Sequence, residues 1–308
     1  MPLTATRARW AAEIEARARA YWTIERTTQL LGDKQPAIRP AEGAVLLRAL
    51  GLLRDDASLP PAQARKYFQI NHMVALLGPA LRVLRERHAT IRLLDVGCGR
   101  SYLTLLLAWC ARHVWNHALE VRGVDRDPDV VAEASRRAEL SGLADAVHFE
   151  VGDAAALATD REVHGVVALH ACDTATCDAL AFGIRVQADV LAVAPCCQAE
   201  LARGWEALAE RGVAGAFAPV WRAPQLRRET AADITDAMRV ELVRAAGYDV
   251  RAMEFVPAEH TRKNTLILAI RADPPADPGD PAYEQLRDAT GGIDIRLART
   301  LGRSVSPR

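Results

Sequence analysis

The stretch LLDVGCGRSYLTLLL, residues 93–107, decides the fold expected for this chain. A continuous apolar strand delivers Asp95, Gly97 and Gly99 follow it, and a helix begins directly behind them. Glycines at this point allow a tight turn and a close backbone approach to a ligand at the helix N-terminus. The dinucleotide-binding pattern has a third glycine at about the position of Ser101. A binding site for the pyrophosphate of a dinucleotide is therefore less well supported. A glycine-rich turn without any ligand is the alternative interpretation.

Strands and helices alternate on both sides of this stretch. Apolar strands separated by amphipathic helices are expected at residues 91–98, 119–127, 146–153, 165–173 and 188–197. This alternation predicts a mostly parallel sheet with helices on both faces. A long connection is expected at residues 217–233, and two further strands joined by a polar turn lie within residues 248–272. The fold class is therefore α/β, with seven strands.

Three regions follow from the composition along the chain. Residues 1–88 carry apolar side chains at helical spacing, so they predict an N-terminal helical region that caps the sheet. Residues 89–272 hold the strand–helix alternation. Residues 273–308 begin with a proline-rich linker and predict a partly mobile tail with a short helix.

The overall composition excludes several classes of protein. Lys plus Arg equals Asp plus Glu at 39 each in 308 residues, which argues against a non-specific nucleic-acid binder. The chain shows no signal peptide, and no apolar run is long enough to span a membrane. Six cysteines spread over this length do not resemble a secreted disulfide framework. A cytoplasmic protein with free thiols and no membrane partner is expected. The oligomeric state stays open.

Acidic residues stand at the ends of three successive strands. Asp95 ends the first, Asp125 the second and Asp153 the third. Open α/β sheets bind ligands at this edge, where Asp125 suits the paired hydroxyls of a ribose and Asp153 could accept from an adenine amino group. Each acid alone could equally be a helix cap or a turn residue.

With these motifs, the sequence resembles the class I S-adenosylmethionine-dependent methyltransferases over about residues 91–272. Its "DVGCG", "VDRDP" and "VGDA" correspond to the first three motifs of that family. The resemblance implies a Rossmann-like seven-stranded sheet and S-adenosylmethionine as the cofactor. It also implies that Asp95, Gly97 and Gly99 line the methionine end, that Asp125 binds the ribose and that Asp153 binds the adenine.

A narrower resemblance rests on "KYFQINHM", "LHACDTATCDAL", "APCCQ", "ITDAMRVELVRAAGY" and "HTRKNTLI". These strings are similar to the methyltransferase-like group of the glutathione S-transferase C-terminal-domain-containing protein, and a tRNA ribose-methylating family has a similar domain. The resemblance implies that Lys66, Gln69 and His170 contact the cofactor. The chain departs from the group at Asp173, where glycine is usual, and at Cys177.

The fourth and fifth strands present the candidate catalytic residues, namely His170, Asp173, Cys196 and Cys197. Four interpretations stay open. The cysteines could be small packing residues, a thiolate could add to a pyrimidine ring, or His170, Cys172, Cys196 and Cys197 could hold zinc or serve redox chemistry. In the fourth, His170 or Asp173 orients or deprotonates the substrate. No metal ligand is assigned, because adjacent cysteines rarely bind one ion together.

Candidate substrate residues lie in two later segments. Trp221, Arg227 and Arg228 could stack on bases and contact phosphates, although a solvated arginine-rich surface is the alternative. His260, Lys263 and Asn264 stand at the turn of the last strand pair. The sequence thus predicts an S-adenosylmethionine-dependent methyltransferase acting on RNA, tRNA or rRNA. A small-molecule or protein methyltransferase, or a non-catalytic cofactor-binding scaffold, is the alternative.

Overall fold

A computed structural model describes residues 3–169, 171, 173–195, 198–255, 264–272 and 281–303. Seven strands form one sheet in the order β3-β2-β1-β4-β5-β7-β6. The pairs β1-β2, β2-β3 and β4-β5 are parallel, whereas β7 is antiparallel to both β5 and β6. The seven-stranded, mostly parallel α/β sheet expected from the sequence is therefore confirmed. The chain divides into two compact units, Met1–Val151 and Gly152–Arg308.

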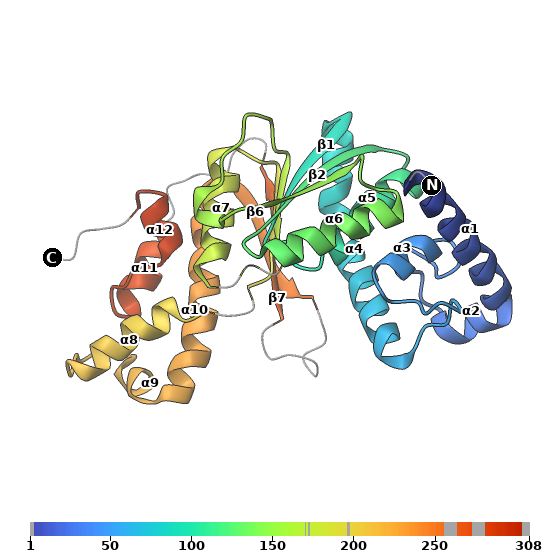
Figure 1. Ribbon diagram of the computed structural model, residues 1–308. Coiled ribbons are helices and arrows are strands. Elements are labelled where there is room, and N and C mark those ends of the chain that lie inside the picture. The colour runs from blue at the N-terminus through green and yellow to red at the C-terminus, as the bar shows by residue number, and fades with distance from the viewer. Residues whose placement is uncertain are drawn as a thin grey trace. The chain divides into compact units, whose positions relative to one another are not determined.

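The first unit holds the N-terminal helices and three strands, of which β1 and β2 are labelled in Figure 1. Its elements are α1 (Leu3–Tyr21), α2 (Ile24–Leu31), α3 (Ala44–Ala49), α4 (Pro61–Arg87), β1 (Thr90–Val96), α5 (Tyr102–His113), β2 (Ala118–Asp125), α6 (Pro128–Ser141) and β3 (Val147–Val151). Local signals set the helix ends. Asp127 accepts hydrogen bonds from the first amides of α6, and Gly142 ends that helix with φ +74°.

The second unit contains four strands and six α-helices among the described residues. Its elements are η1 (Ala154–Ala156), β4 (Gly165–Ala168), α7 (Thr174–Arg185), β5 (Val190–Val193), α8 (Glu200–Glu210), α9 (Ala218–Arg222), α10 (Pro224–Arg244), β6 (Tyr248–Glu254), β7 (Thr265–Arg271), α11 (Ala282–Ala289) and α12 (Arg296–Thr300). Strands β4 and β5 are buried along their whole length. Gly183 lets α7 pack closely on them, because a Cβ there would lie 2.3 Å from Leu191 Cδ2.

The connection expected at residues 217–233 is wrong, because this segment forms α9 and the first half of α10. Two prolines, Pro219 and Pro224, lie in this segment. In the structure each stands in the first turn of a helix, where its missing N–H removes no intrahelical hydrogen bond.

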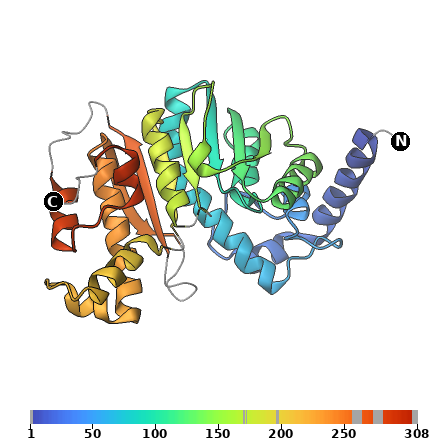
Figure 2. The same ribbon diagram turned by 60° about the vertical axis from the view of Figure 1, so that its left-hand side comes forward.

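The tail contains two short helices where one was expected. Residues 281–303 form α11 and α12, whereas residues 273–280 and 304–308 lie outside the described residues. Tyr283 is 1% exposed and Leu297 is fully buried, because α11 packs on α10 and α12 packs on α7. Figure 2 shows this part of the second unit from another side. This part of the tail is therefore folded.

Ion pairs and a hydrogen bond connect α12 to α7 and α8. Arg296 Nε donates to Asp178 Oδ1 on α7 over 2.7 Å, and its amide donates to Glu200 Oε2 at the start of α8 over 2.9 Å. Arg299 also pairs with Glu200. Across the described residues, no helix combines the length and apolar character that a membrane span requires.

Candidate functional site

The turn after β1 adopts an unusual backbone. Gly97, Gly99 and Ser101 have φ angles of +67°, +53° and +59°. Gly97 and Cys98 both donate their amides to Val124 O at the end of β2, over 2.7 and 3.1 Å. Ser101 thus takes a left-handed conformation that glycine adopts more readily, at a cost of about 1–2 kcal/mol. The turn draws the ends of β1 and β2 together directly in front of α5.

Asp125 accepts a backbone amide with each carboxylate oxygen, and one of these amides belongs to this turn. Its Oδ2 accepts the Gly99 amide over 2.9 Å, and its Oδ1 accepts the Asp127 amide over 3.1 Å. The side chain is only half-buried. Each carboxylate oxygen can accept more than one hydrogen bond, so the group is oriented by the backbone and can still accept from hydroxyls. This fits the ribose-binding role expected from the sequence.

Asp95 is the buried acid of the first unit. It is 7% exposed, and Thr104 on α5 donates a hydrogen bond to its Oδ2. Burial raises the pKa of Asp95 to about 6, the hydrogen bond from Thr104 opposes this rise, and the negative charge of Asp125 adds to it. A carboxylate held in this way would be stabilised by a cationic ligand group.

Lys66 and Gln69 lie next to each other on α4, as their spacing predicts. Lys66 Nζ donates to Gln69 Oε1 over 3.4 Å and lies 5.1 Å from the centre of the Tyr102 ring. The Arg137 guanidinium carbon lies 5.5 Å from the same ring. Burial lowers the pKa of Lys66, and the charge of Arg100 lowers it further. Cations therefore gather beside the first residue of α5 in the first unit.

Asp153 belongs to the second unit, whereas Asp95 and Asp125 belong to the first. Its Oδ1 accepts the Ala155 amide over 2.8 Å at the start of η1. This is the helix-cap geometry that the sequence offered as the alternative. The contact with adenine stays a prediction.

Asp173 stands at the start of α7 in a strained backbone conformation. Its φ and ψ angles are +51° and −116°, a region that favours glycine. Its Oδ1 accepts the Ala199 amide over 3.1 Å, and its Oδ2 lies 3.2 Å from Arg203 Nη2. The departure from the usual glycine at this position therefore introduces a carboxylate that binds the segment before α8.

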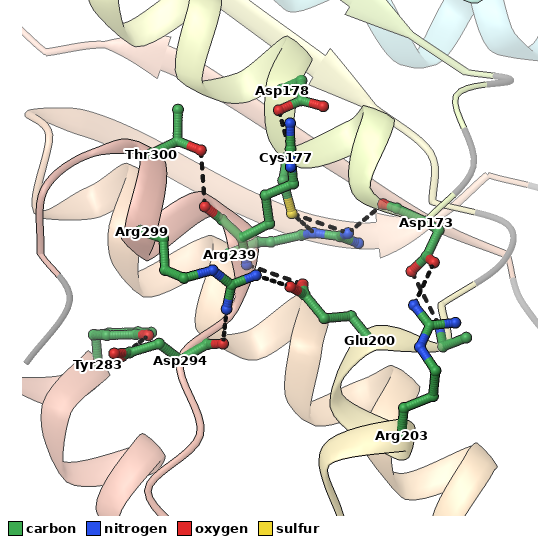
Figure 3. A network of polar contacts seen from close by, with 12 residues as sticks. Asp173, Cys177, Asp178, Glu200, Arg203, Arg239, Tyr283, Asp294, Arg299 and Thr300 are labelled. Atoms are coloured by element: carbon green, nitrogen blue, oxygen red, sulfur yellow. Dashed lines mark hydrogen bonds and ion pairs between the residues drawn. The ribbon is translucent and has the colours of Figure 1, made fainter. Parts of the chain in front are cut away.

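Arg239 on α10 is the residue that sequence reasoning missed. It is 1% exposed, and Figure 3 shows it between Asp173 and Cys177. Its Nη2 donates to Asp173 O over 2.9 Å, and its Nη1 donates to Asp236 Oδ1 over 3.1 Å. Nε and Nη2 also contact Cys177 Sγ at 3.4 and 3.3 Å. The available signal was a charged residue between the apolar residues Met238 and Val240 in the sequence.

Gln198 extends these contacts to the segment after β5. Its Nε2 donates to Asp236 Oδ1 over 2.5 Å. Its Oε1 is buried and has no hydrogen-bond partner among the residues that the structure describes. We call Asp173, Cys177, Gln198, Asp236 and Arg239 the Arg239 network. Burial raises the pKa of the Cys177 thiol, although Arg239 opposes this effect, so this thiol is not activated as a nucleophile.

The expected substrate residues are not equally accessible. Trp221 is 2% exposed and lies 6.5 Å from the Trp205 ring centre, so it does not offer a stacking surface as expected. Arg227 pairs with Glu206 and donates to Trp221 O over 2.8 Å. Arg228 is exposed, and its Nη2 donates to Gln225 Oε1 over 3.0 Å.

The remaining candidates lie mostly outside the described residues. Asn264 is 8% exposed at the start of β7, and its backbone oxygen accepts the Phe255 amide over 2.9 Å. The candidates beyond the described part are His170, Cys172, Cys196, Cys197, His260 and Lys263. Among the residues described, no cluster of three histidine, cysteine or acidic side chains could hold a metal ion.

Residues 65–204 match the family model described as a methyltransferase domain. The matched part includes the turn after β1, Asp125 and Asp173. This part of the chain is therefore similar to methyltransferase domains.

Two curated proteins are similar to parts of the chain. The uncharacterized protein YjhP of Escherichia coli (strain K12) is 36% identical over 96 residues, which cover 31% of this chain and 32% of that protein. The uncharacterized RNA methyltransferase BH0687 of Halalkalibacterium halodurans is 28% identical over 131 residues, 42% of this chain and 25% of that protein. The chain thus spans about a third of the length of YjhP and a quarter of the length of BH0687.

Solved structures with bound cofactor also resemble the chain. The magnesium protoporphyrin IX methyltransferase ChlM from Synechocystis PCC 6803, with bound SAH, is 18% identical. The alignment covers 70% of this chain and 89% of that chain, with a TM-score of 0.41.

Proposed function

We propose that this protein is an S-adenosylmethionine-dependent methyltransferase that acts on RNA. The observation that carries the first part is the turn after β1, where Gly99 and Asp125 are joined within the segment that matches a methyltransferase domain. Left-handed glycines and an oriented carboxylate form a site for a ribose-bearing ligand without any bulky side chain in the turn.

The residues of the first unit fit the cofactor chemically. Asp125 accepts from the ribose hydroxyls, and the buried Asp95 carboxylate favours the positively charged methionine end. Gly97 and Gly99 leave the backbone open to close approach, and Lys66 adds a cation beside α5. When bound, S-adenosylmethionine supplies a methyl group on a sulfonium that a nucleophile displaces in line. In the second unit, Asp153 is assigned to the adenine.

RNA as the acceptor is supported by three weaker observations. A relative that is similar over 131 residues is described as an RNA methyltransferase. The narrower resemblance includes a tRNA-modifying family, and Arg222 and Arg228 are exposed on α9 and α10. Because Trp221 is buried, we expect α9 and α10 to contact the phosphates of the RNA through these arginines and not to stack on its bases.

The catalytic assignment remains with His170, Asp173, Cys196 and Cys197. The amide of Ala199 and the guanidinium of Arg203 already engage Asp173. This supports orientation rather than proton abstraction for Asp173, so deprotonation of the acceptor falls to His170 in this proposal.

Transfer of a tritiated methyl group tests the proposal. Total RNA, total protein and a metabolite extract are each incubated with the wild-type protein and labelled S-adenosylmethionine, and we expect label in RNA. Label in protein alone, or in metabolites alone, would overturn the RNA assignment.

Calorimetric titration with S-adenosylhomocysteine tests the cofactor site separately. We expect Asp125→Ala to weaken binding about 100-fold, because two charge-assisted hydrogen bonds to hydroxyls are lost. Asp145→Ala is the matched control, since Asp145 is an acid of the same unit that pairs with Arg112 at the surface. No binding by the wild type at millimolar ligand would refute the cofactor site.

A further inference from the structure

The Arg239 network joins three elements of the second unit. Asp173 and Cys177 belong to the start of α7, Gln198 precedes α8, and Asp236 and Arg239 lie on α10. Figure 3 shows Arg239 pointing from α10 toward the start of α7. One buried side chain therefore contacts the segment after β4 and, through Asp236, the segment after β5.

The charge of Arg239 requires this set of partners. A guanidinium that is 1% exposed is costly unless its donors are paired. An apolar side chain of similar size would fill the same space without needing hydrogen-bond partners, so packing alone does not explain an arginine here. The carbonyl of Asp173, the Asp236 carboxylate and the Cys177 sulfur supply the acceptors. The position of α10 is thereby coupled to the backbone of Asp173.

The backbone that Arg239 contacts is strained. Asp173 has a positive φ of +51°, which a residue with a side chain adopts only when its surroundings hold it there. Arg239 binds its carbonyl oxygen, and Ala199 and Arg203 bind its carboxylate. Strain of this kind is stored where a fixed geometry is needed, and Asp173 follows "HAC" in the sequence.

The segments after β4 and β5 are linked twice. The Ala199 amide donates directly to Asp173, and Gln198 reaches Arg239 through Asp236. In the sequence, Gln198 directly follows the Cys196–Cys197 pair. Any movement of one segment therefore disturbs hydrogen bonds of the other.

We propose that Arg239 is a positioning residue of the methyltransferase reaction. It fixes the carbonyl of Asp173 and, through Asp236, the amide of Gln198, so that the segments after β4 and β5 keep one arrangement during methyl transfer. This inference rests on the proposed function. Its structural half, that Arg239 couples the segments after β4 and β5, can be tested without an activity assay.

Kinetics of Arg239 variants test the catalytic half. At temperatures where every variant is folded, we expect Arg239→Met to lower kcat about 100-fold, whereas the dissociation constant of S-adenosylhomocysteine changes less than about twofold. Arg239→Lys retains one positive charge and recovers part of the rate. Arg287→Met is the matched control, because Arg287 is a buried arginine of α11 paired with Asp288 and Asp294. We expect the control to lose stability but to keep kcat within about twofold.

Equal losses of kcat in Arg239→Met and Arg287→Met would overturn the proposal, since the effect would then follow stability alone. If Arg239→Met does not fold, Gln198→Ala replaces it. That variant removes one end of the network and leaves Arg239 paired with Asp236 and Asp173. A kcat about tenfold below wild type is expected for it, and an unchanged kcat would overturn the proposal.

Hydrogen exchange tests the structural half. In Arg239→Met we expect faster exchange of backbone amides in both residues 174–182 and residues 198–205, and no such change in Arg287→Met. Unchanged exchange in either segment would refute the coupling. If the wild type transfers no methyl group to any acceptor, the proposed function fails, whereas the exchange result still decides whether Arg239 couples the segments.

Discussion

At the scale of single residues, the binding role proposed for Asp95 carries a cost in stability. Its carboxyl group is buried with Asp125 nearby, and its pKa rises from 3.8 to about 6. A rise of about two units corresponds to about 3 kcal/mol between the two protonation states. Because the pKa is raised in the folded state, the favourable contribution is present below pH 3.8 and is lost as the pH rises through about 6.

Asp95→Asn is therefore expected to stabilise the unliganded protein at neutral pH. Asparagine keeps an acceptor for Thr104 and removes the buried charge. At about pH 8 the free energy of unfolding should rise by about 1–3 kcal/mol, and its dependence on pH between about 4 and 6 should flatten. Denaturant unfolding at several pH values measures this. A variant less stable than wild type at about pH 8 would contradict the assigned cost of burial.

The same carboxyl group should make cofactor affinity depend on pH. A cationic ligand favours the ionised form of Asp95, so affinity for S-adenosylmethionine should rise from about pH 5 and level off above about pH 7. Calorimetry in buffers of different ionisation enthalpy would record the released proton near pH 6. Asp95→Asn should bind more weakly and lose this dependence. An affinity that falls as the pH rises over this range would contradict the prediction.

At the scale of elements, two substitutions of Asp173 at the start of α7 distinguish the energy of backbone strain from that of the side-chain hydrogen bonds. Asp173→Ala loses the bonds to Ala199 and Arg203 and keeps the positive φ, so it should destabilise the protein by about 2–3 kcal/mol. Asp173→Gly loses the same bonds but relieves about 1–3 kcal/mol of strain, which leaves its stability near that of wild type. Denaturant unfolding compares the two variants. Equal stabilities of the alanine and glycine variants would show that Asp173 is not strained.

Periodicity and glycine spacing predicted the elements to which the proposed cofactor site is assigned. The turn at residues 93–107 and the strand ending at Asp125 are local signals, because each is set by a few adjacent residues. The helix α9 and the first half of α10 were missed, because a proline such as Pro219 or Pro224 resembles a break unless its position in the first turn is known. The docking of α12 depends on Asp178 and Glu200, which are distant in sequence.

Individual side chains of the site were harder to predict than elements. Trp221 was expected to stack on bases because it occurs together with arginines, yet its ring is buried beside Gly291 and Trp205. The role of Arg239 was not predicted, because its contacts join residues of different elements and no local sequence pattern shows that they meet. Contacts of this kind are set by packing between elements.

At the scale of the whole molecule, the proposed functions divide between the two units. The first unit carries the turn after β1, Asp95, Asp125 and Lys66, and the second carries the Arg239 network. Binding of the methionine and ribose parts of the cofactor is therefore assigned to one unit, and positioning of the segments after β4 and β5 is assigned to the other. If this division holds, variants in one unit should leave the other property intact.

Ligand-induced stabilisation of the full chain tests that division. At about 100 times the dissociation constant, S-adenosylhomocysteine should stabilise the native state by about 2.7 kcal/mol and raise the unfolding temperature by a few degrees. Arg239→Met should keep this shift although it loses activity, because its network does not include the turn after β1. Asp125→Ala should require about 100-fold more ligand for the same shift, whereas Asp145→Ala should behave like wild type. Loss of the shift in Arg239→Met would show that cofactor binding depends on the network, and the division of functions would then be wrong.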